Sequence, residues 1–330
     1  MNRTGLRVAI TGGAGFLGSA LARRLLSMSS LPVGGSAPEP IAELFLLDLV
    51  QPPTDLSTDP RVRSLTGELE QTISHLEDVD LVCHLAGVVS GAAEADFDLG
   101  VRTNLDALRQ VLDRCRVMAP PPVFVFTSSL AVFGSDPAIG PIGAVDDNTL
   151  PRPQSSYGIQ KFIGEQLVAD YTRKGFLRGR SVRLMTVAVR PGKPNAAASS
   201  FISGIIREPL AGVRATCPVP PSTPIALSSP RCTIDGIVKA ITARDRTWGS
   251  RTAMNLPALT TTPREMADAL DRVCGTQRSS LIDWEVDQSI LAIMGSWPAR
   301  FSTPRAEALG LAAETSFDDV VREYMESSGR

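Results

Sequence analysis

The sequence predicts an α/β protein with a doubly wound parallel sheet and a smaller, less regular C-terminal part. Short apolar runs alternate with amphipathic helical segments over positions 1–190. The apolar runs are nearly continuous, which is typical of strands covered by helices on both faces. A glycine-rich turn joins the first strand to the first helix, as in the Rossmann type of this fold.

The elements follow in order from the N-terminus. Residues 6–11 form an apolar run, and residues 16–28 have apolar side chains at helical spacing. A loop insertion rich in Ser, Gly and Pro (residues 29–40) precedes a second strand at 44–47. Further strands are expected at 80–85, 123–126 and 181–189, and helices at 101–118 and 155–174. After about residue 190, apolar runs shorten and Pro, Ser and Thr increase.

Composition excludes several classes of function. The chain has 330 residues, 43 % of them hydrophobic, and a net charge of -2, which gives no reason to expect nucleic acid or a membrane surface as partner. Five cysteines without a CxxC motif and only two histidines make disulfides, a metal site and a Ser-His-Asp triad poor interpretations. No signal segment and no run of about 18 apolar residues occurs, so we expect a cytoplasmic protein.

The glycine-rich turn TGGAGFLG (residues 11–18) lies between the first strand and the first helix. Its glycines let backbone amides approach a pyrophosphate, and the helix presents its positive end to that charge. Asp48 ends the second strand, where a carboxylate can bind the adenosine ribose and would repel the extra phosphate of NADP. An ordinary turn and a strand-end aspartate are the alternatives. The pattern predicts NAD binding by Gly12, Gly15, Phe16, Leu17, Gly18 and Asp48.

Tyr157 and Lys161 are four residues apart, so both side chains lie on one face of the predicted helix. A lysine ammonium beside a phenol favours the phenolate and is expected to lower the pKa of Tyr157, making it a general base. On its own such a pair is common on solvated helices. Ser129 ends the preceding strand, at the edge where parallel sheets place ligands, and can hydrogen-bond the reacting oxygen.

Together, TGGAGFLG, HLAG, Asn104, FVFTSSLAVFG and YGIQK resemble the extended short-chain dehydrogenases, the NAD-dependent epimerase/dehydratase family. The resemblance is strong from the N-terminus to about position 190 and implies a catalytic Ser129, Tyr157 and Lys161. The usual Gly-Asp after the third strand is Gly67-Glu68 here, and His84 is interpreted as structural. Further cofactor contacts implied by the resemblance are Glu68, Leu69, Leu85, Ala86, Gly87, Asn104, Tyr157 and Lys161.

Three further segments, VVSGAAEADFDLGVRTNLD, PQSSYGIQK and RPGKPNAAASSFISGIIREPLAG, resemble a branch of this family that oxidises the 2-hydroxyl of a four-carbon sugar acid. The resemblance implies oxidation of D-erythronate to 2-keto-D-erythronate with NAD. A carboxylate substrate needs a cation, because burying an unpaired charge is costly. The candidate substrate contacts are Ser90, Ser129, Lys193, Asn195 and Arg231.

Two other functions stay open. A nucleotide-sugar epimerase or dehydratase would use the same three residues, although Leu130 and Ala131 after Ser129 argue against a dehydratase. A non-enzymatic NAD-binding protein is the second alternative. We expect a cofactor domain at residues 1–190 with a return segment near 228–245, and a mainly substrate-binding part at 191–330. The resemblance also implies a homodimer or larger assembly through helices 101–118 and 155–174.

Overall fold

The computed structural model describes residues 5–194 and 197–329 of the chain. A seven-stranded sheet has the order β10-β6-β5-β4-β1-β2-β3, and every neighbouring pair runs parallel. This confirms the predicted fold class. The strands are β1 (Leu6–Thr11), β2 (Ile41–Asp48), β3 (Val62–Thr66), β4 (Leu81–His84), β5 (Val123–Ser129), β6 (Arg178–Leu184) and β10 (Met254–Asn255).

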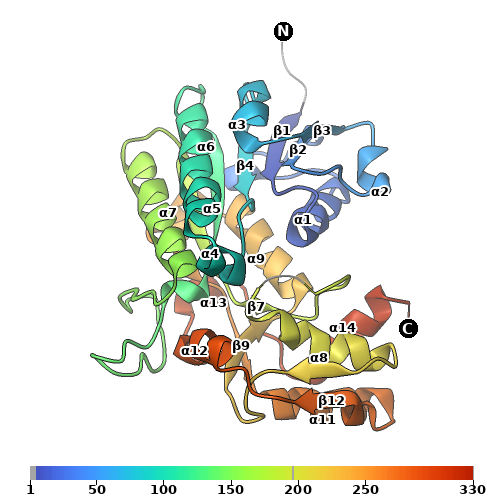
Figure 1. The fold of residues 1–330 in the computed structure, drawn as a ribbon. Coiled ribbons are helices and arrows are strands. Elements are labelled where there is room, and N and C mark those ends of the chain that lie inside the picture. Colours follow the sequence, from blue (N-terminus) through green and yellow to red (C-terminus); the bar gives the residue numbers. More distant parts are fainter. Residues whose placement is uncertain (1–4, 195–196, 330) are drawn as a thin grey trace.

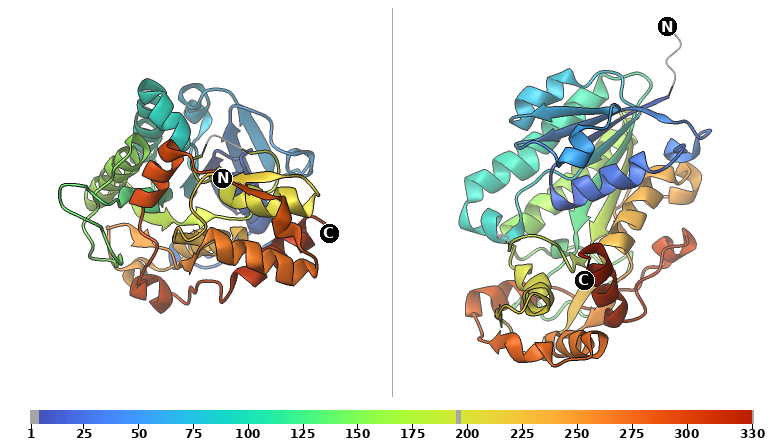
Figure 2. Two further views of the ribbon diagram at one scale, coloured as in Figure 1. Left: turned by 60° about the horizontal axis from the view of Figure 1, so that its bottom comes forward. Right: turned by 90° about the vertical axis from the view of Figure 1, so that its right-hand side faces the viewer.

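Helices cover both faces of this sheet, as Figures 1 and 2 show. Alternate residues of β1 belong to different cores. Val8 and Ile10 pack with α1 (Phe16–Leu26) and α9 (Pro230–Thr242) on one face. Ala9 packs on the other face with residues of α6 (Ala107–Arg116) and α7 (Ser156–Arg173). The continuous apolar strands therefore fill two cores at once.

The lower part of Figure 1 holds a second core, made largely by the C-terminal half of the chain. It combines α8 (Ser200–Leu210), α11 (Pro263–Cys274) and α14 (Phe317–Ser327) with two small sheets. One sheet has the order β11-β9-β7, and the other pairs β12 with β8. Their strands are β7 (Thr186–Val187), β8 (Ala215–Cys217), β9 (Ile225–Ser228), β11 (Leu259–Thr261) and β12 (Ile282–Trp284).

The remaining elements are short, apart from α12. The α-helices are α2 (Thr54–Ser57), α3 (Leu69–Thr72), α4 (Ser90–Ala95), α5 (Phe97–Val101), α10 (Asp245–Trp248), α12 (Gln288–Ser296) and α13 (Pro304–Ala308). Single 3-10 turns lie at Val33–Gly35, Ile73–His75, Leu130–Val132 and Arg278–Leu281. Within the described ranges, no helix is long and apolar enough to span a membrane.

Two predicted elements differ from the structure. The expected strand at 181–189 is two strands, because β6 joins the large sheet whereas β7 pairs with β9 in the small one. The expected helix at 101–118 begins as a π-helical stretch, Arg102–Asp106, before α6. Buried Asn104 lies in that stretch and bonds to residues outside its own helix, which keeps the extra residue in the turn.

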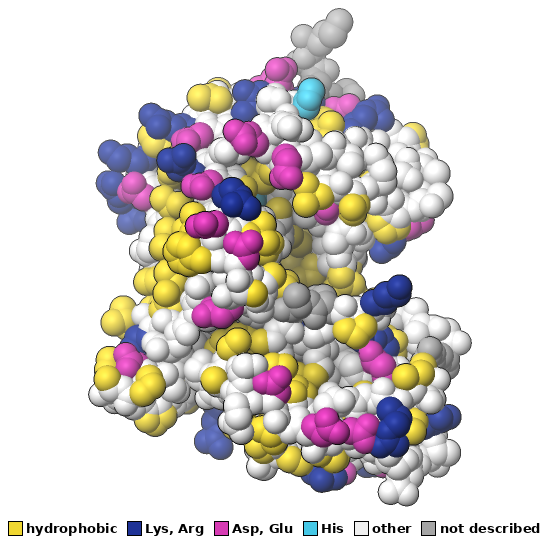
Figure 3. Space-filling model, viewed as in Figure 1, with side chains coloured by type: hydrophobic (Ala, Val, Ile, Leu, Met, Phe, Trp, Pro, Cys, Tyr) yellow, Lys and Arg dark blue, Asp and Glu magenta, His cyan; other side chains and the backbone are white. Residues whose placement is uncertain are grey.

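The chain returns to the first core after entering the second. Helix α9 packs against the large sheet, and β10 adds its outermost strand beside β6. We propose the division near residue 190, with a return segment near 228–245, as a working description of the two parts. Figure 3 shows that the surface is hollowed between the upper and lower parts of the molecule.

Candidate active site

The loop between β1 and α1 is shaped by close contacts that only glycine permits. Gly12 has a φ of 71°, and a Cβ there would lie 2.8 Å from the backbone nitrogen of Ala86. A Cβ on Gly18 would collide with the carbonyl oxygen of Gly12. Gly15 is the N-cap of α1, and no side chain of the described residues caps this helix. The first-turn amides are thus available for an anion, and the loop fits the pyrophosphate of NAD.

Asp48 binds the same loop from the end of β2. Its Oδ2 accepts a hydrogen bond from the Ala14 amide at 2.9 Å, and Oδ1 accepts from the Leu49 amide at 2.7 Å. The Val50 amide also donates to Oδ1, at 3.5 Å, and because a carboxylate has about four acceptor positions these three amides leave capacity for a ribose hydroxyl. Glu68 and Leu69 lie beside it after β3, where the Gly67 amide donates to the Asp48 carbonyl at 2.9 Å.

The turn after β4 brings Leu85, Gly87 and Ser90 to the wall of one cavity, together with loop residues Gly12 and Gly18. Ala86 lies between them, and its amide donates to Thr11 Oγ1 at 3.3 Å. Buried Ser90 accepts a hydrogen bond from the Ala198 amide at 3.3 Å.

Asn104 supports this turn from behind. Its Oδ1 accepts from the Val88 amide at 3.0 Å, and its Nδ2 donates to Gln160 Oε1 at 2.7 Å. The side chain is 3 % exposed, and Asn104 is not among the described residues that line the cavity. A direct contact between Asn104 and NAD therefore stays a prediction, whereas the hydrogen bond of Asn104 to the turn after β4 is observed.

His84 occupies the last position of β4 and is fully buried beside the cofactor loop. Its Nδ1 lies 2.8 Å from Thr11 Oγ1. Burial lowers the pKa of His84 to about 3, and the positive charge of Lys161 acts in the same direction. His84 is therefore neutral at physiological pH and ties β4 to β1, which agrees with its structural interpretation.

The structure brings Ser129, Tyr157 and Lys161 together at the carboxyl ends of the strands, on the wall of this cavity of about 320 Å³. Ser129 is the last residue of β5, and its hydroxyl hydrogen-bonds with Tyr157. Tyr157 and Lys161 occupy the first turns of α7, whose N-cap is Ser155. Lys161 Nζ donates to the Thr127 carbonyl at 2.9 Å and lies 5.7 Å from the centre of the Tyr157 ring.

Burial dominates the electrostatics of this group. Desolvation raises the pKa of Tyr157 to about 12, against the opposing effects of the Ser129 hydrogen bond and the positive charge of Arg190. Desolvation also lowers the pKa of Lys161 to about 8, whereas Glu165 raises it. The pKa of Tyr157 is therefore raised in the chain alone, and not lowered as expected from Lys161, because desolvation of the phenol outweighs the Ser129 hydrogen bond and the charge of Arg190.

Arg190 is a functional candidate that the sequence analysis missed. It follows β7 and lines the cavity with Tyr157 and Ser90. Among the described residues no carboxylate pairs with it, and burial and the nearby Arg207 lower its pKa. Arg190 ends the apolar run predicted as a strand, and that position could have identified it. Trp297, which also lines the cavity, follows α12 and carried no such signal.

Two of the predicted substrate residues, Lys193 and Arg231, are not among the described residues that line this cavity. Lys193 is exposed and is not among the described lining residues. Arg231 lies in the first turn of α9, mainly exposed, where its Nε is 3.3 Å from Glu323 Oε2 of α14. It lines a different hollow, of about 360 Å³. Asn195 lies outside the described residues.

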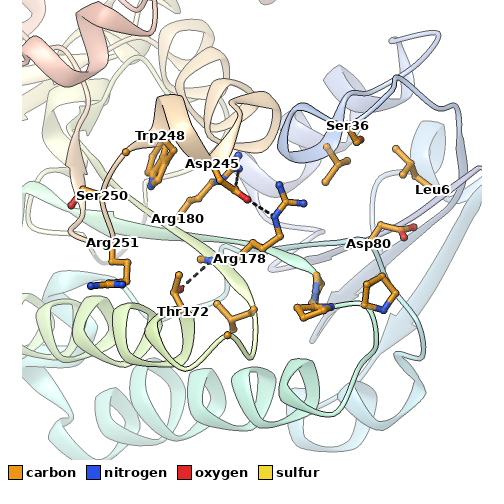
Figure 4. Close-up of a pocket in the computed structure, with 18 of the residues that line it drawn as sticks. Leu6, Ser36, Asp80, Thr172, Arg178, Arg180, Asp245, Trp248, Ser250 and Arg251 are labelled. Atoms are coloured by element: carbon orange, nitrogen blue, oxygen red, sulfur yellow. Dashed lines mark hydrogen bonds and ion pairs between the residues drawn. The ribbon is translucent and has the colours of Figure 1, made fainter.

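A larger hollow, of about 890 Å³, lies at the opposite edge of the sheet, where the strands begin (Figure 4). Arg178 and Arg180 of β6 both pair there with Asp245, at 2.9 Å and 2.7 Å. Arg180 also donates to the carbonyl oxygens of Ala240 and Ile241 at the end of α9. These charges thus stabilise the end of the sheet at which the parallel strands begin. None of the predicted catalytic or cofactor residues lines this hollow.

The fold and the glycine loop define a dinucleotide-binding α/β enzyme. The model of the NAD dependent epimerase/dehydratase family matches residues 8–222, and the chain belongs to this family. NAD is accordingly its cofactor, and the residues around the glycine loop would hold it.

Two relatives and one solved structure are similar over nearly the whole chain. A D-erythronate dehydrogenase of Cupriavidus necator is 49 % identical over 328 residues, covering 98 % of this chain and 99 % of the relative. One of Haemophilus influenzae is 40 % identical, covering 97 % and 99 %. The crystal structure of a nucleoside-diphosphate-sugar epimerase from Agrobacterium tumefaciens is 38 % identical with a TM-score of 0.85, covering 98 % and 94 %.

Proposed function

We propose that this chain is an NAD-dependent dehydrogenase that oxidises the 2-hydroxyl of D-erythronate to give 2-keto-D-erythronate. The main observation behind this proposal is that Ser129, Tyr157 and Lys161 line the same cavity, of about 320 Å³, as Arg190. The Arg190 guanidinium has no carboxylate partner among the described residues, which suits a substrate that carries a carboxylate. The two relatives named D-erythronate dehydrogenase support the same substrate.

In the proposed reaction, Tyr157 Oη takes the proton of the substrate hydroxyl. The hydrogen on C2 leaves with the electron pair of the C2–H bond, as a hydride. Ser129 Oγ holds the reacting oxygen, and Lys161 and Arg190 add the positive charge that a phenolate needs. When bound, oxidised NAD supplies the hydride acceptor and one further positive charge. Because burial raises the pKa of Tyr157 to about 12 in the chain alone, proton acceptance depends on these cations.

The test is NADH formation from four- to six-carbon sugar acids, with nucleotide sugars as the competing class. We expect turnover of D-erythronate, and a fall in kcat of about 10²–10⁴ in Tyr157→Phe with little change in NAD affinity. Tyr171→Phe is the matched control, because this second tyrosine of α7 donates its hydroxyl to Asp113, at an exposed site. Near-normal turnover in Tyr157→Phe contradicts the mechanism.

Ser129→Ala is expected to lower kcat less than Tyr157→Phe, because one hydrogen bond is lost rather than the proton acceptor. Lys161→Met is expected to lower both kcat and NAD affinity. These two variants separate the roles within the group on the same substrate.

Arg190 is proposed to bind the substrate carboxylate. Arg190→Met removes charge-assisted hydrogen bonds and is expected to raise KM for the acid about 10²-fold, with NAD affinity retained. Lys193→Met and Arg231→Met provide the comparison, since both side chains are exposed and are not among the described lining residues. If Arg231→Met raises KM and Arg190→Met does not, the carboxylate is bound by Arg231.

The second candidate is a nucleotide-sugar epimerase, which the solved structure from Agrobacterium tumefaciens favours by its name. The cavity that would receive this substrate also includes glycine-loop residues Gly12, Gly15 and Gly18. Conversion of a nucleotide sugar without net NADH formation would establish the alternative.

We also propose that two copies of the chain pair through the helices expected from the sequence, at 101–118 and 155–174, together with α5, which adjoins α7. Phe97, Ile159 and Ile163 on these helices are 64 %, 46 % and 41 % exposed. Exposed apolar side chains on adjoining helices are typical of a protein–protein interface.

A further inference from the structure

A buried ion pair lies directly behind the proposed catalytic group. Glu165 lies four residues after Lys161 on α7, and Arg183 lies in β6. Arg183 Nη2 is 2.7 Å from Glu165 Oε2, and Arg183 Nε donates to Oε1 at 2.8 Å. Their side chains are only 6 % and 2 % exposed. Such a pair must remain complete, because removing one partner leaves an uncompensated buried charge.

The carboxylate also reaches the strand that ends in Ser129. Ser128 Oγ donates to Glu165 Oε1 at 2.5 Å. Glu165 thus connects the middle of α7 to β5 and β6 near the carboxyl ends of these strands. Tyr157, Lys161 and Glu165 are spaced four residues apart, so the three side chains follow one face of the helix. The positions of the Tyr157 phenol and the Lys161 ammonium relative to Ser129 therefore depend on the contacts that Glu165 makes.

Glu165 also acts on Lys161 through its charge. Lys161 is 5 % exposed, and its burial lowers the pKa of the ammonium to about 8, with Glu165 as the opposing influence. The other titratable groups around Lys161 are the Tyr157 phenol and His84, which is neutral at physiological pH. Arg183 adds a positive charge beside Glu165. Glu165 is hence the negative charge that favours the ammonium within the described surroundings.

We propose that Glu165 is a positioning residue for the oxidation: it holds Lys161 as an ammonium and, through Ser128 and Arg183, fixes α7 against the strand that carries Ser129. The inference rests on the proposed function, because it assigns Glu165 a part in that reaction. Glu165 is not among the described residues that line the cavity, so it acts through Lys161 and Ser129 rather than on the substrate.

The charge effect can be measured without substrate or cofactor. The chain has four lysines, Lys161, Lys174, Lys193 and Lys239, so selective ¹⁵N labelling gives a simple side-chain spectrum. Lys161→Met identifies the Lys161 signal. We expect Glu165→Gln to lower the pH midpoint of the Lys161 titration by about one unit or more. Arg183→Met is expected to raise it, because the carboxylate then acts on Lys161 without its competing cation.

The opposite signs separate this proposal from a purely structural role, since general loosening would move the midpoint in the same direction in both variants. Asp245→Asn is the matched control. It removes the carboxylate that binds Arg180 of the same strand at the far edge of the sheet (Figure 4), and it should leave Lys161 unchanged. If either single variant does not fold, the double variant Glu165→Gln with Arg183→Met leaves no unpaired buried charge, and it should still lower the Lys161 midpoint because Glu165 is the charge that acts on Lys161.

Turnover provides the second readout. In Glu165→Gln we expect kcat to decline at a lower pH on the alkaline side than in the unchanged protein, because the ammonium is lost earlier. An unmoved Lys161 midpoint, or shifts of equal sign in Glu165→Gln and Arg183→Met, overturns the proposal. If Tyr157→Phe stops turnover while these midpoints stay fixed, the proposed function stands and only the role of Glu165 fails. Normal turnover in Tyr157→Phe contradicts the proposed function, and the Lys161 midpoints then report only the charge effect of Glu165 on Lys161.

Discussion

Replacing Asp48 tests how the chain distinguishes NAD from NADP. In Asp48→Asn the shape is kept, but the charge and one of the two acceptor oxygens are lost. Two unit charges about 4 Å apart interact by about 4 kcal/mol at an effective dielectric constant near 20. Asp48 is partly exposed, so about half of this, roughly 2 kcal/mol, is a reasonable expectation. The preference for NAD should then narrow about 30-fold.

The assay is direct binding of each cofactor by calorimetry, which needs no substrate. Asp48→Ala loses both hydrogen bonds to Ala14 and Leu49, so its NAD affinity should fall further than that of Asp48→Asn. Both variants should narrow the ratio of the two dissociation constants similarly, because both lose the charge. Equal affinities for NAD and NADP in the unchanged protein, or an unaltered ratio in Asp48→Asn, would refute the reasoning.

Three further predictions concern the loop, the buried histidine and the assembly. Gly18→Ala should abolish NAD binding in calorimetry because its Cβ collides with the phosphate loop, whereas Gly204→Ala, with its nearest atom 3.5 Å away, should not. His84 stays neutral when folded, so stability is lost as pH falls from about 6.5 toward 3; at pH 5 the loss is about 2 kcal/mol. Urea unfolding at pH 7 and 5 should show this loss reduced in His84→Gln but not in the exposed His75→Gln control. Ile159→Asp should convert a dimer to monomers in light scattering, and a monomeric unchanged protein would contradict the interface.

The N-terminal part of the chain, up to about position 190, was predictable because its signals are local. Continuous apolar runs and a glycine turn predict the strands of a parallel sheet and the cofactor loop, and the carboxyl ends of β4 and β5 place Leu85 and Ser129 on one cavity. The second core lacked such signals. Its strands are two to four residues long, too short for periodicity to reveal.

The charged substrate contacts were the hardest part of the site to predict. Arg231 was a candidate for the substrate carboxylate, but its direction depends on Glu323, which is 92 residues away in sequence. Arg190, by contrast, faces Tyr157 because the chain leaves β7 toward the cavity. The π-helical stretch at Asn104 depends likewise on distant partners, Val88 and Gln160. The spacing of residues along the sequence does not predict partners that are this far apart in the chain.

The late return of the chain to its first sheet also affects the order of synthesis. When the chain as far as Arg190 has emerged from a ribosome, six of the seven strands exist, but α9 and β10 do not. One apolar face of the sheet then lacks Ile234 and Ile237, and β6 has an open edge until Met254 and Asn255 arrive. The cofactor-binding half therefore matures only after much of the other half has been made, and a nascent chain of this length exposes surface that chaperones recognise.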